Sequence, residues 1–108
     1  MGSARYRVEW TVDAEGDALG IVGRFDSRTN ADRVLLGFDK RAKSLASLPE
    51  RGRIVPELER IGIMQYHEVL LDPWRMLFEI RDHVVFIVAV FDGRRDLADV
   101  LFERFARP

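Results

Sequence analysis

Hydrophobic and polar residues alternate at the start of the chain and then fall on helical faces. Over residues 6–12 every second side chain is apolar, which is the pattern of a strand with one buried face. A helix capped by Asp13 follows, with apolar residues at helical spacing up to Phe25. A second helix, starting at Ser27 or Asn30, keeps this spacing until Pro49 ends it. The pattern predicts an antiparallel helical hairpin that packs on a sheet.

The second half of the chain has the pattern of a sheet. Residues 64–71 are a plausible strand, and residues 74–81 alternate, which predicts a strand with one buried face. Residues 84–91, VVFIVAVF, are apolar at every position, as in a central strand covered on both faces. Helical spacing returns over residues 97–105. We therefore predict an α+β fold: an N-terminal strand, a two-helix hairpin, a three-stranded antiparallel meander and a short C-terminal helix.

The stretch LPERGRIVPEL, residues 48–58, lies between the hairpin and the meander. Pro49 breaks the second helix, Gly52 frees the backbone, and Pro56 favours an extended entry into the sheet. We expect this link to be structural, holding the hairpin against the sheet.

Composition limits the classes of function. The 108 residues suit one domain, with residues 5–108 as the domain and residues 1–4 as a disordered start or a cloning remnant. The absence of cysteine excludes disulfides and thiol catalysis, and the lack of a long apolar run predicts a soluble, cytoplasmic protein without a membrane span. A net charge of −1 gives no overall attraction to nucleic acid. We expect no metal and no cofactor, since metal-ligand spacing and glycine-rich phosphate loops are missing.

Three segments carry a resemblance to a known family. They read SLASLPERGRIVPEL, YHEVLLDPWRMLFEI and VVFIVAVFDGRRDL. With these segments the chain resembles the toxins of the RelE/ParE superfamily of bacterial type II toxin-antitoxin systems, and most closely the ParE-like, or plasmid stabilization, branch. The resemblance implies a compact toxin neutralised by a cognate antitoxin. RelE-like members cut messenger RNA on the ribosome, whereas ParE-like members poison DNA gyrase.

Two arginines match phosphate-binding positions of the RelE-like nucleases. The resemblance assigns this role to Arg75, which follows Trp74, and to Arg95. A guanidinium suits the task because its planar fork bonds two phosphate oxygens and stays charged. An alternative interpretation is that these arginines form salt bridges with carboxylates, for which Glu68, Glu79 and Asp92 are the candidates.

The rest of the nuclease set is replaced. The position of a catalytic tyrosine is occupied by Leu101, which cannot transfer a proton, and two lysine positions are occupied by His67 and Val69. His67 or Asp92 could act as a general base. A structural histidine, and an Asp92 that pairs with a nearby arginine or caps the last helix, are the plainer interpretations.

Three readings follow. The first is a toxin that is no enzyme by itself and inhibits growth by binding DNA gyrase, with Trp74, Arg75, Arg94 and Arg95 as target contacts. The second is a ribosome-dependent endoribonuclease that uses Arg75, Arg95, His67 and Asp92 on messenger RNA. The third is an inactive binding module with the toxin fold. In each, an antitoxin would form a hetero-oligomer through the hairpin and the first strand, at Trp10, Val22, Phe25, Val34 and Phe38.

Overall fold

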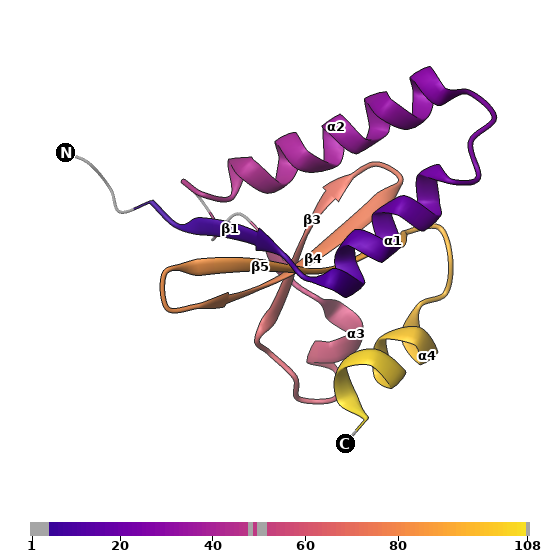
Figure 1. The fold of residues 1–108 in the computed structure, drawn as a ribbon. Helices are drawn as coiled ribbons and strands as arrows, with labels where there is room; N and C mark the ends of the chain where they lie inside the picture. The colour runs from indigo at the N-terminus through magenta and orange to yellow at the C-terminus, as the bar shows by residue number, and fades with distance from the viewer. Residues whose placement is uncertain (1–4, 48, 50–51, 108) are drawn as a thin grey trace.

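The computed structural model describes residues 5–47, 49 and 52–107, so the expected N-terminal segment 1–4 and part of the 48–58 link lie outside the described residues. The α+β class and the predicted order of elements are confirmed, with additions (Figure 1). The elements are β1 (Arg7–Trp10), α1 (Val12–Val22), α2 (Arg28–Ser44), β2 (Arg53–Ile54), α3 (Pro56–Glu59), β3 (Tyr66–Leu71), β4 (Trp74–Arg81), β5 (Val84–Asp92), α4 (Ala98–Leu101) and a π-helical stretch (Phe102–Ala106).

The strands form one five-stranded sheet in the order β1-β5-β4-β3-β2. β1 runs parallel to β5, and the other neighbours are antiparallel. Sequence patterning missed β2 and α3, because two and four residues are too short to show a period. Pro56 does not hold an extended entry as expected. It occupies the first turn of α3, where its missing N–H has no helical partner to lose.

Helices cover both faces of the sheet (Figure 1). On one face α1 and α2 pack through Ala18 and Phe38 on Met76 and Phe78, and on the other face Leu58 and Leu101 pack on Leu77. The prediction of one buried face for β4 is therefore wrong, whereas the prediction of two covered faces for β5 is confirmed.

Helix boundaries differ from the sequence pattern at the first helix. Thr11, not Asp13, is its N-cap, because the Thr11 hydroxyl accepts a hydrogen bond from the Ala14 amide at 3.1 Å. Val12 is consequently a helix residue and is 82% exposed, although its alternation with Trp10 had placed it in the strand. At the second helix Ser27 caps, accepting from the Asn30 amide at 3.2 Å.

β1 covers only the first half of β5, pairing with Val84 to Ile87. Beyond that point two side chains bond the open edge. Asp17 of α1 accepts a hydrogen bond from the Val90 amide at 3.0 Å, and Arg104 donates to the Val88 carbonyl at 2.8 Å. Asp17 and Arg104 also form an ion pair at 2.9 Å, and we call this pair the edge cap. It links the C-terminal segment to α1 across the end of the sheet.

In the described part of the chain, no helix is both long and apolar enough to cross a membrane.

Candidate functional site

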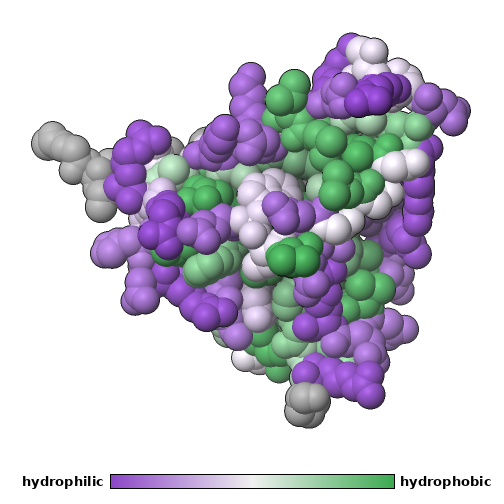
Figure 2. Space-filling view, viewed as in Figure 1, coloured by the Kyte–Doolittle hydropathy of each residue, from purple (hydrophilic) through white to green (hydrophobic). Residues whose placement is uncertain are grey.

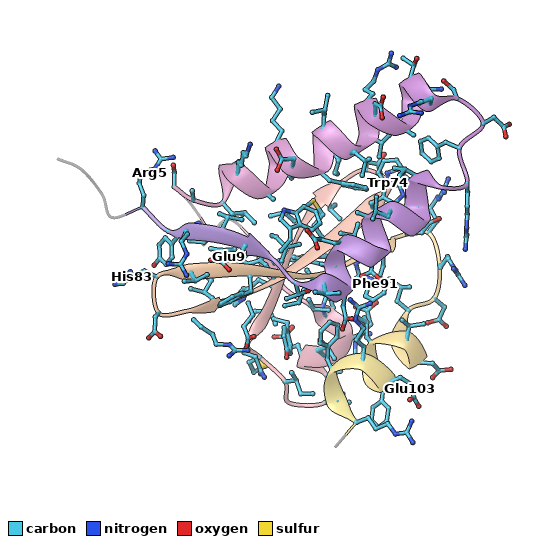
Figure 3. The ribbon with its side chains drawn as sticks, viewed as in Figure 1. Arg5, Glu9, Trp74, His83, Phe91 and Glu103 are labelled. Carbon is cyan, nitrogen blue, oxygen red and sulfur yellow. The ribbon has the colours of Figure 1, made fainter. Side chains whose placement is uncertain are left out.

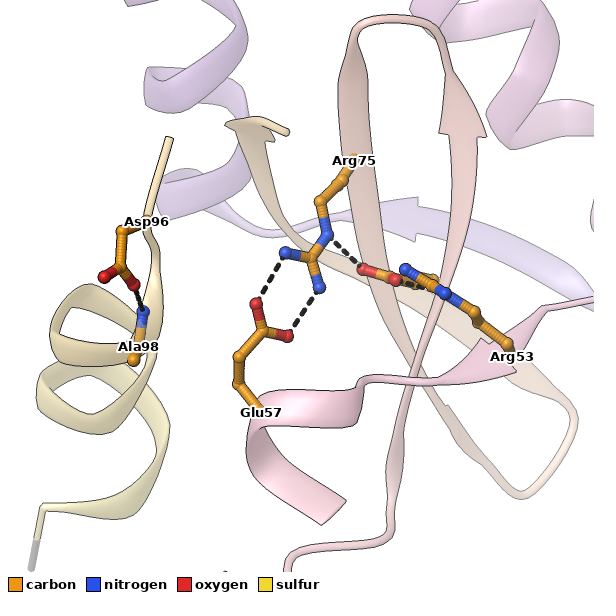
Figure 4. A network of polar contacts seen from close by, with 6 residues as sticks. Arg53, Glu57, Arg75, Asp96 and Ala98 are labelled. Atoms are coloured by element: carbon orange, nitrogen blue, oxygen red, sulfur yellow. Dashed lines mark hydrogen bonds and ion pairs between the residues drawn. The ribbon is translucent and has the colours of Figure 1, made fainter. Parts of the chain in front are cut away.

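Arg75 on β4 lies in a buried ion-pair network (Figure 4). Its guanidinium donates to both carboxylate oxygens of Glu57, at 2.8 and 2.7 Å, and its Nε donates to Glu68 at 2.7 Å. The Glu68 side chain is 0% exposed, and its second oxygen accepts from Arg53 at 2.6 Å. The arginine fork is thus filled by two carboxylates, so the salt-bridge interpretation of Arg75 is correct for Glu68.

Glu57 and Arg75 stay ionised over the working pH range. The hydrogen bonds from Arg75 lower the pKa of Glu57 to about 2, and burial opposes this only in part. The same pairing with Glu57, and then with Glu68, raises the pKa of Arg75. Glu57 was missed from sequence because it sits on a helix too short to predict and 18 positions from Arg75.

The structure brings together four residues that the sequence analysis had singled out, namely Trp74, Asp92, Arg94 and Arg95. They line a cleft of about 500 Å³ that lies between α1 and the end of β5, and we call it the α1–β5 cleft. On the α1 side sequence reasoning had singled out only Phe25, as an antitoxin contact, and it missed Arg24, because the packing of α1 on β5 is not visible in the sequence. The lining residues from α1 and just beyond it are Gly16, Asp17, Gly20, Ile21, Arg24 and Phe25.

The carboxylate of Asp92 forms an ion pair with a neighbouring arginine of the cleft. Arg94 donates to both of its oxygens, at 3.0 and 2.9 Å, which lowers the pKa of Asp92 to about 2. The alternative interpretation, a pair between Asp92 and a neighbouring arginine, is correct. A carboxylate with such a low pKa is a weak general base near neutral pH, where efficient bases have a pKa closer to 7.

Trp74 is held by aromatic neighbours beneath the hairpin (Figure 3). Its ring lies edge-on to Phe38 at a centroid distance of 5.3 Å, and Phe25 lies on it at 6.4 Å. Phe25 therefore joins the cleft wall. Trp74 and Phe25 thus form an aromatic wall of the α1–β5 cleft, and the ring of Trp74 already contacts other aromatic rings of the protein.

His67 lies on the other face of the sheet from Arg75. It pairs with Phe78, whose side chain belongs to the hairpin-side core, and the two rings stack at 5.8 Å. Its Nδ1 atom is buried without a hydrogen-bond partner among the described residues. Val69, at the second lysine position, is 9% exposed in the same core, and Leu101 is 0% exposed in the opposite one, as its apolar character predicted. The structure thus does not assemble the four proposed nuclease residues.

A second hollow, of about 380 Å³, lies between α1 and α2, and we call it the hairpin groove. Trp10, Leu19 and Leu35 line it, and Glu15 and Asp39 add two carboxylates. Figure 2 shows apolar side chains gathered over the hairpin. Of the residues expected to contact an antitoxin, Trp10 and Phe38 line this groove, although Phe38 is only 1% exposed. Val22 is 7% exposed and belongs to the core. Phe25 lines the other cleft, and Val34 is half-buried against the core.

No group of three metal-ligating side chains occurs among the residues that the structure describes.

A family model described as the ParE toxin of the type II toxin-antitoxin system parDE matches residues 8–97. The chain belongs to this ParE toxin family. The match runs from β1 to the residue before α4, so it includes the α1–β5 cleft, the Arg75 network and the hairpin groove. The recognition of a RelE/ParE-type toxin from sequence is confirmed.

Two solved structures have the fold of this ParE family member. The chromosomal ParDE toxin-antitoxin system from P. aeruginosa superposes with a TM-score of 0.68 at 16% identity, covering 83% of this chain and 98% of the other. The RelBE2 toxin-antitoxin complex from Mycobacterium tuberculosis gives 0.62 at 22% identity, covering 84% and 94%. No curated protein matches the chain in sequence. At these identities the likeness concerns the fold, and the assignment to the ParE family rests on the family match.

Proposed function

We propose that this ParE family member inhibits growth by binding and poisoning DNA gyrase, and that a cognate antitoxin neutralises it. The observation that carries the proposal, beside the family match, is the filled guanidinium of Arg75. A nuclease of this fold would need that cation to hold the scissile phosphate. Here it is bonded to Glu57 and Glu68, and its side chain is only 9% exposed.

The described residues at the candidate proton-transfer positions are also poorly suited to that role. Cleavage of a phosphodiester requires a group that takes or gives a proton, typically worth about 10² to 10⁴ in rate. Asp92 is a weak base, Leu101 is an apolar core residue, and His67 lies across the sheet from Arg75. Binding without cutting is the activity that these residues support.

The target contact is proposed at the α1–β5 cleft. Arg94 and Arg95 are exposed beside Trp74, and Arg24 adds a third guanidinium from the end of α1. In this proposal Arg75 has a structural role, because its ion pairs with Glu57 and Glu68 fix β4 next to the cleft. The proposal implies a cytoplasmic protein, where gyrase acts, and a toxin-antitoxin pair of the kind that serves in plasmid stabilization.

The antitoxin is proposed to dock on the hairpin groove. Leu19 is 59% exposed there, next to Trp10 and Leu35, and such grooves accept one face of an amphipathic helix. Glu15 and Asp39 favour basic residues flanking that face. The two similar solved structures are themselves toxin-antitoxin systems, which supports an antitoxin partner.

The test compares purified parent protein with two double variants. We expect the parent to make gyrase accumulate cleaved DNA and to leave ribosome-bound message intact. Arg94→Ala with Arg95→Ala should weaken the gyrase effect by about tenfold or more, because charged contacts at a target site contribute on this scale. Arg33→Ala with Arg41→Ala removes the same charge from exposed positions on α2 and should act like the parent.

Two outcomes would contradict the proposal. Cleavage of message in the ribosomal A site by the parent, lost on substitution of His67 or Asp92, would establish the endoribonuclease. Absence of both activities in folded parent protein would favour an inactive binding module.

A further inference from the structure

The α1–β5 cleft holds two arginines that make no direct ion pair in the described structure. Of its two acidic residues, Asp17 pairs with Arg104, and Asp92 pairs with Arg94. Arg24 and Arg95 have no side-chain hydrogen bond or ion pair among the described residues, and both are exposed. Because guanidinium groups stay protonated at all working pH values, the cleft presents two cations with free hydrogen-bond donors, one from each wall.

The shape of the cleft suits a polypeptide. Gly16 and Gly20 lie along its α1 wall, and a Cβ atom built on either would find no atom within 4 Å beyond its chain neighbours and the nearby backbone of its own helix. A backbone can therefore approach the helix closely. Ile21, Phe25 and Phe91 supply apolar contact, and a volume of about 500 Å³ lies in the usual range of ligand sites.

The same residues disfavour nucleic acid. Single strands bind by stacking bases on free aromatic faces along a positively charged groove. Trp74 already contacts Phe25 and Phe38, and Asp17 and Asp92 would repel a ligand that carries a phosphate at every unit. A peptide can place its carboxylates at Arg24 and Arg95 alone.

We infer that the α1–β5 cleft binds a short acidic segment of a partner polypeptide, with Arg24 and Arg95 as its carboxylate-binding residues. Since Trp74, Arg94 and Arg95 are also the proposed target contacts, the bound segment competes with the target. This competition rests on the proposed function, whereas the choice of ligand rests on the cleft alone.

Fluorescence anisotropy tests the choice of ligand. The probes are a short fluorescein-labelled peptide of glutamate and leucine, its counterpart with glutamine for glutamate, and labelled oligothymidylate. The parent should bind the acidic peptide, and added NaCl should weaken this binding by screening. Arg24→Ala with Arg95→Ala should weaken it by about tenfold or more, since two charge-assisted contacts are lost. The Arg33→Ala, Arg41→Ala control should bind as the parent does.

Three outcomes of these binding experiments would overturn the inference. Equal binding of the acidic peptide by the parent and by the folded Arg24, Arg95 variant overturns the site, and so does equal binding of the glutamine peptide. Tighter binding of oligothymidylate that displaces the peptide assigns the cleft to nucleic acid and overturns the inference. In the gyrase assay the acidic peptide should suppress DNA cleavage. If the peptide binds but the parent never affects gyrase, the proposed function fails and the ligand assignment stands.

Discussion

At the scale of single residues, Gly52 shows why a glycine occupies the link between hairpin and sheet. A Cβ atom there would lie 2.5 Å from the Phe78 ring and 3.0 Å from the Glu68 carbonyl oxygen. Phe78 is 0% exposed, so its ring has little room to move. The sequence suggested that Gly52 frees the backbone, and the structure adds close packing as a reason.

We expect Gly52→Ala to lower the free energy of unfolding by about 1 to 3 kcal/mol, the usual cost of overpacking a core. Gly16→Ala is the matched control. Its new methyl group meets open space within a helix, so it should stabilise the protein by about 0.5 to 1 kcal/mol. Urea unfolding measures both. A Gly52→Ala variant as stable as the parent would show that Phe78 adapts and that close packing is not the reason for glycine.

Arg75 gives a second prediction at this scale. Arg75→Met should destabilise by about 3 to 5 kcal/mol, because the fully buried Glu68 loses one of its two cations. Combining Arg75→Met with Glu68→Met should recover much of this loss, since an apolar pair removes the buried charge. Chemical denaturation measures the stabilities, and the gyrase assay of the double variant gives the second readout. Retained gyrase poisoning agrees with a structural Arg75, whereas its loss in a stable double variant would return Arg75 to the target surface.

At the scale of elements, α3 is attached to the sheet by the bidentate pair between Glu57 and Arg75. The pKa of Glu57 falls from its ordinary 4.5 to about 2 in the folded protein. A lowered carboxylate pKa stabilises the fold above the unfolded pKa and loses that contribution as pH falls toward the folded pKa. The attachment of α3 therefore weakens between about pH 4.5 and pH 2.

Glu57→Gln is expected to be less stable than the parent at neutral pH, by at most about 3 kcal/mol. The difference between the two proteins should shrink as pH falls through this window and vanish near pH 2. Guanidinium chloride unfolding at several pH values measures it, and other acidic groups cancel in the difference. A difference that stays constant down to pH 2 would mean that the Glu57 charge contributes nothing.

Elements with a long period could be predicted, and short ones could not. Both hairpin helices were evident from spacing, because one face of each is buried over several turns, and β5 was evident from its continuous apolar run, because both of its faces are covered. β2 and α3 are held by long-range pairing and left no period. The same limit applied to the site: sequence named Trp74, Arg94 and Arg95, but Arg24 and Glu57 reach their positions only through the fold.

At the scale of the whole molecule, the charged residues form two groups that differ in how they are paired. Arg75, Glu57 and Glu68 lie on the α3 side and are internally neutralised, whereas the α1–β5 cleft retains arginines that make no direct ion pair in the described structure. A net charge of −1 hid this asymmetry, because it averages over both groups. Spacing along the chain could not reveal that His67 and Arg75 belong to opposite faces, since that depends on the pairing register of β3 with β4.

The edge cap has a consequence for the order in which the chain is made. An open strand edge is a template for a strand of another molecule, and proteins guard such edges with charged side chains. Here one guard, Asp17, is synthesised before β5, but the other, Arg104, is synthesised after it. The second half of β5 therefore lacks one of its two guards until Arg104 has been synthesised, and a chain shortened before Arg104 is expected to self-associate more readily than the parent.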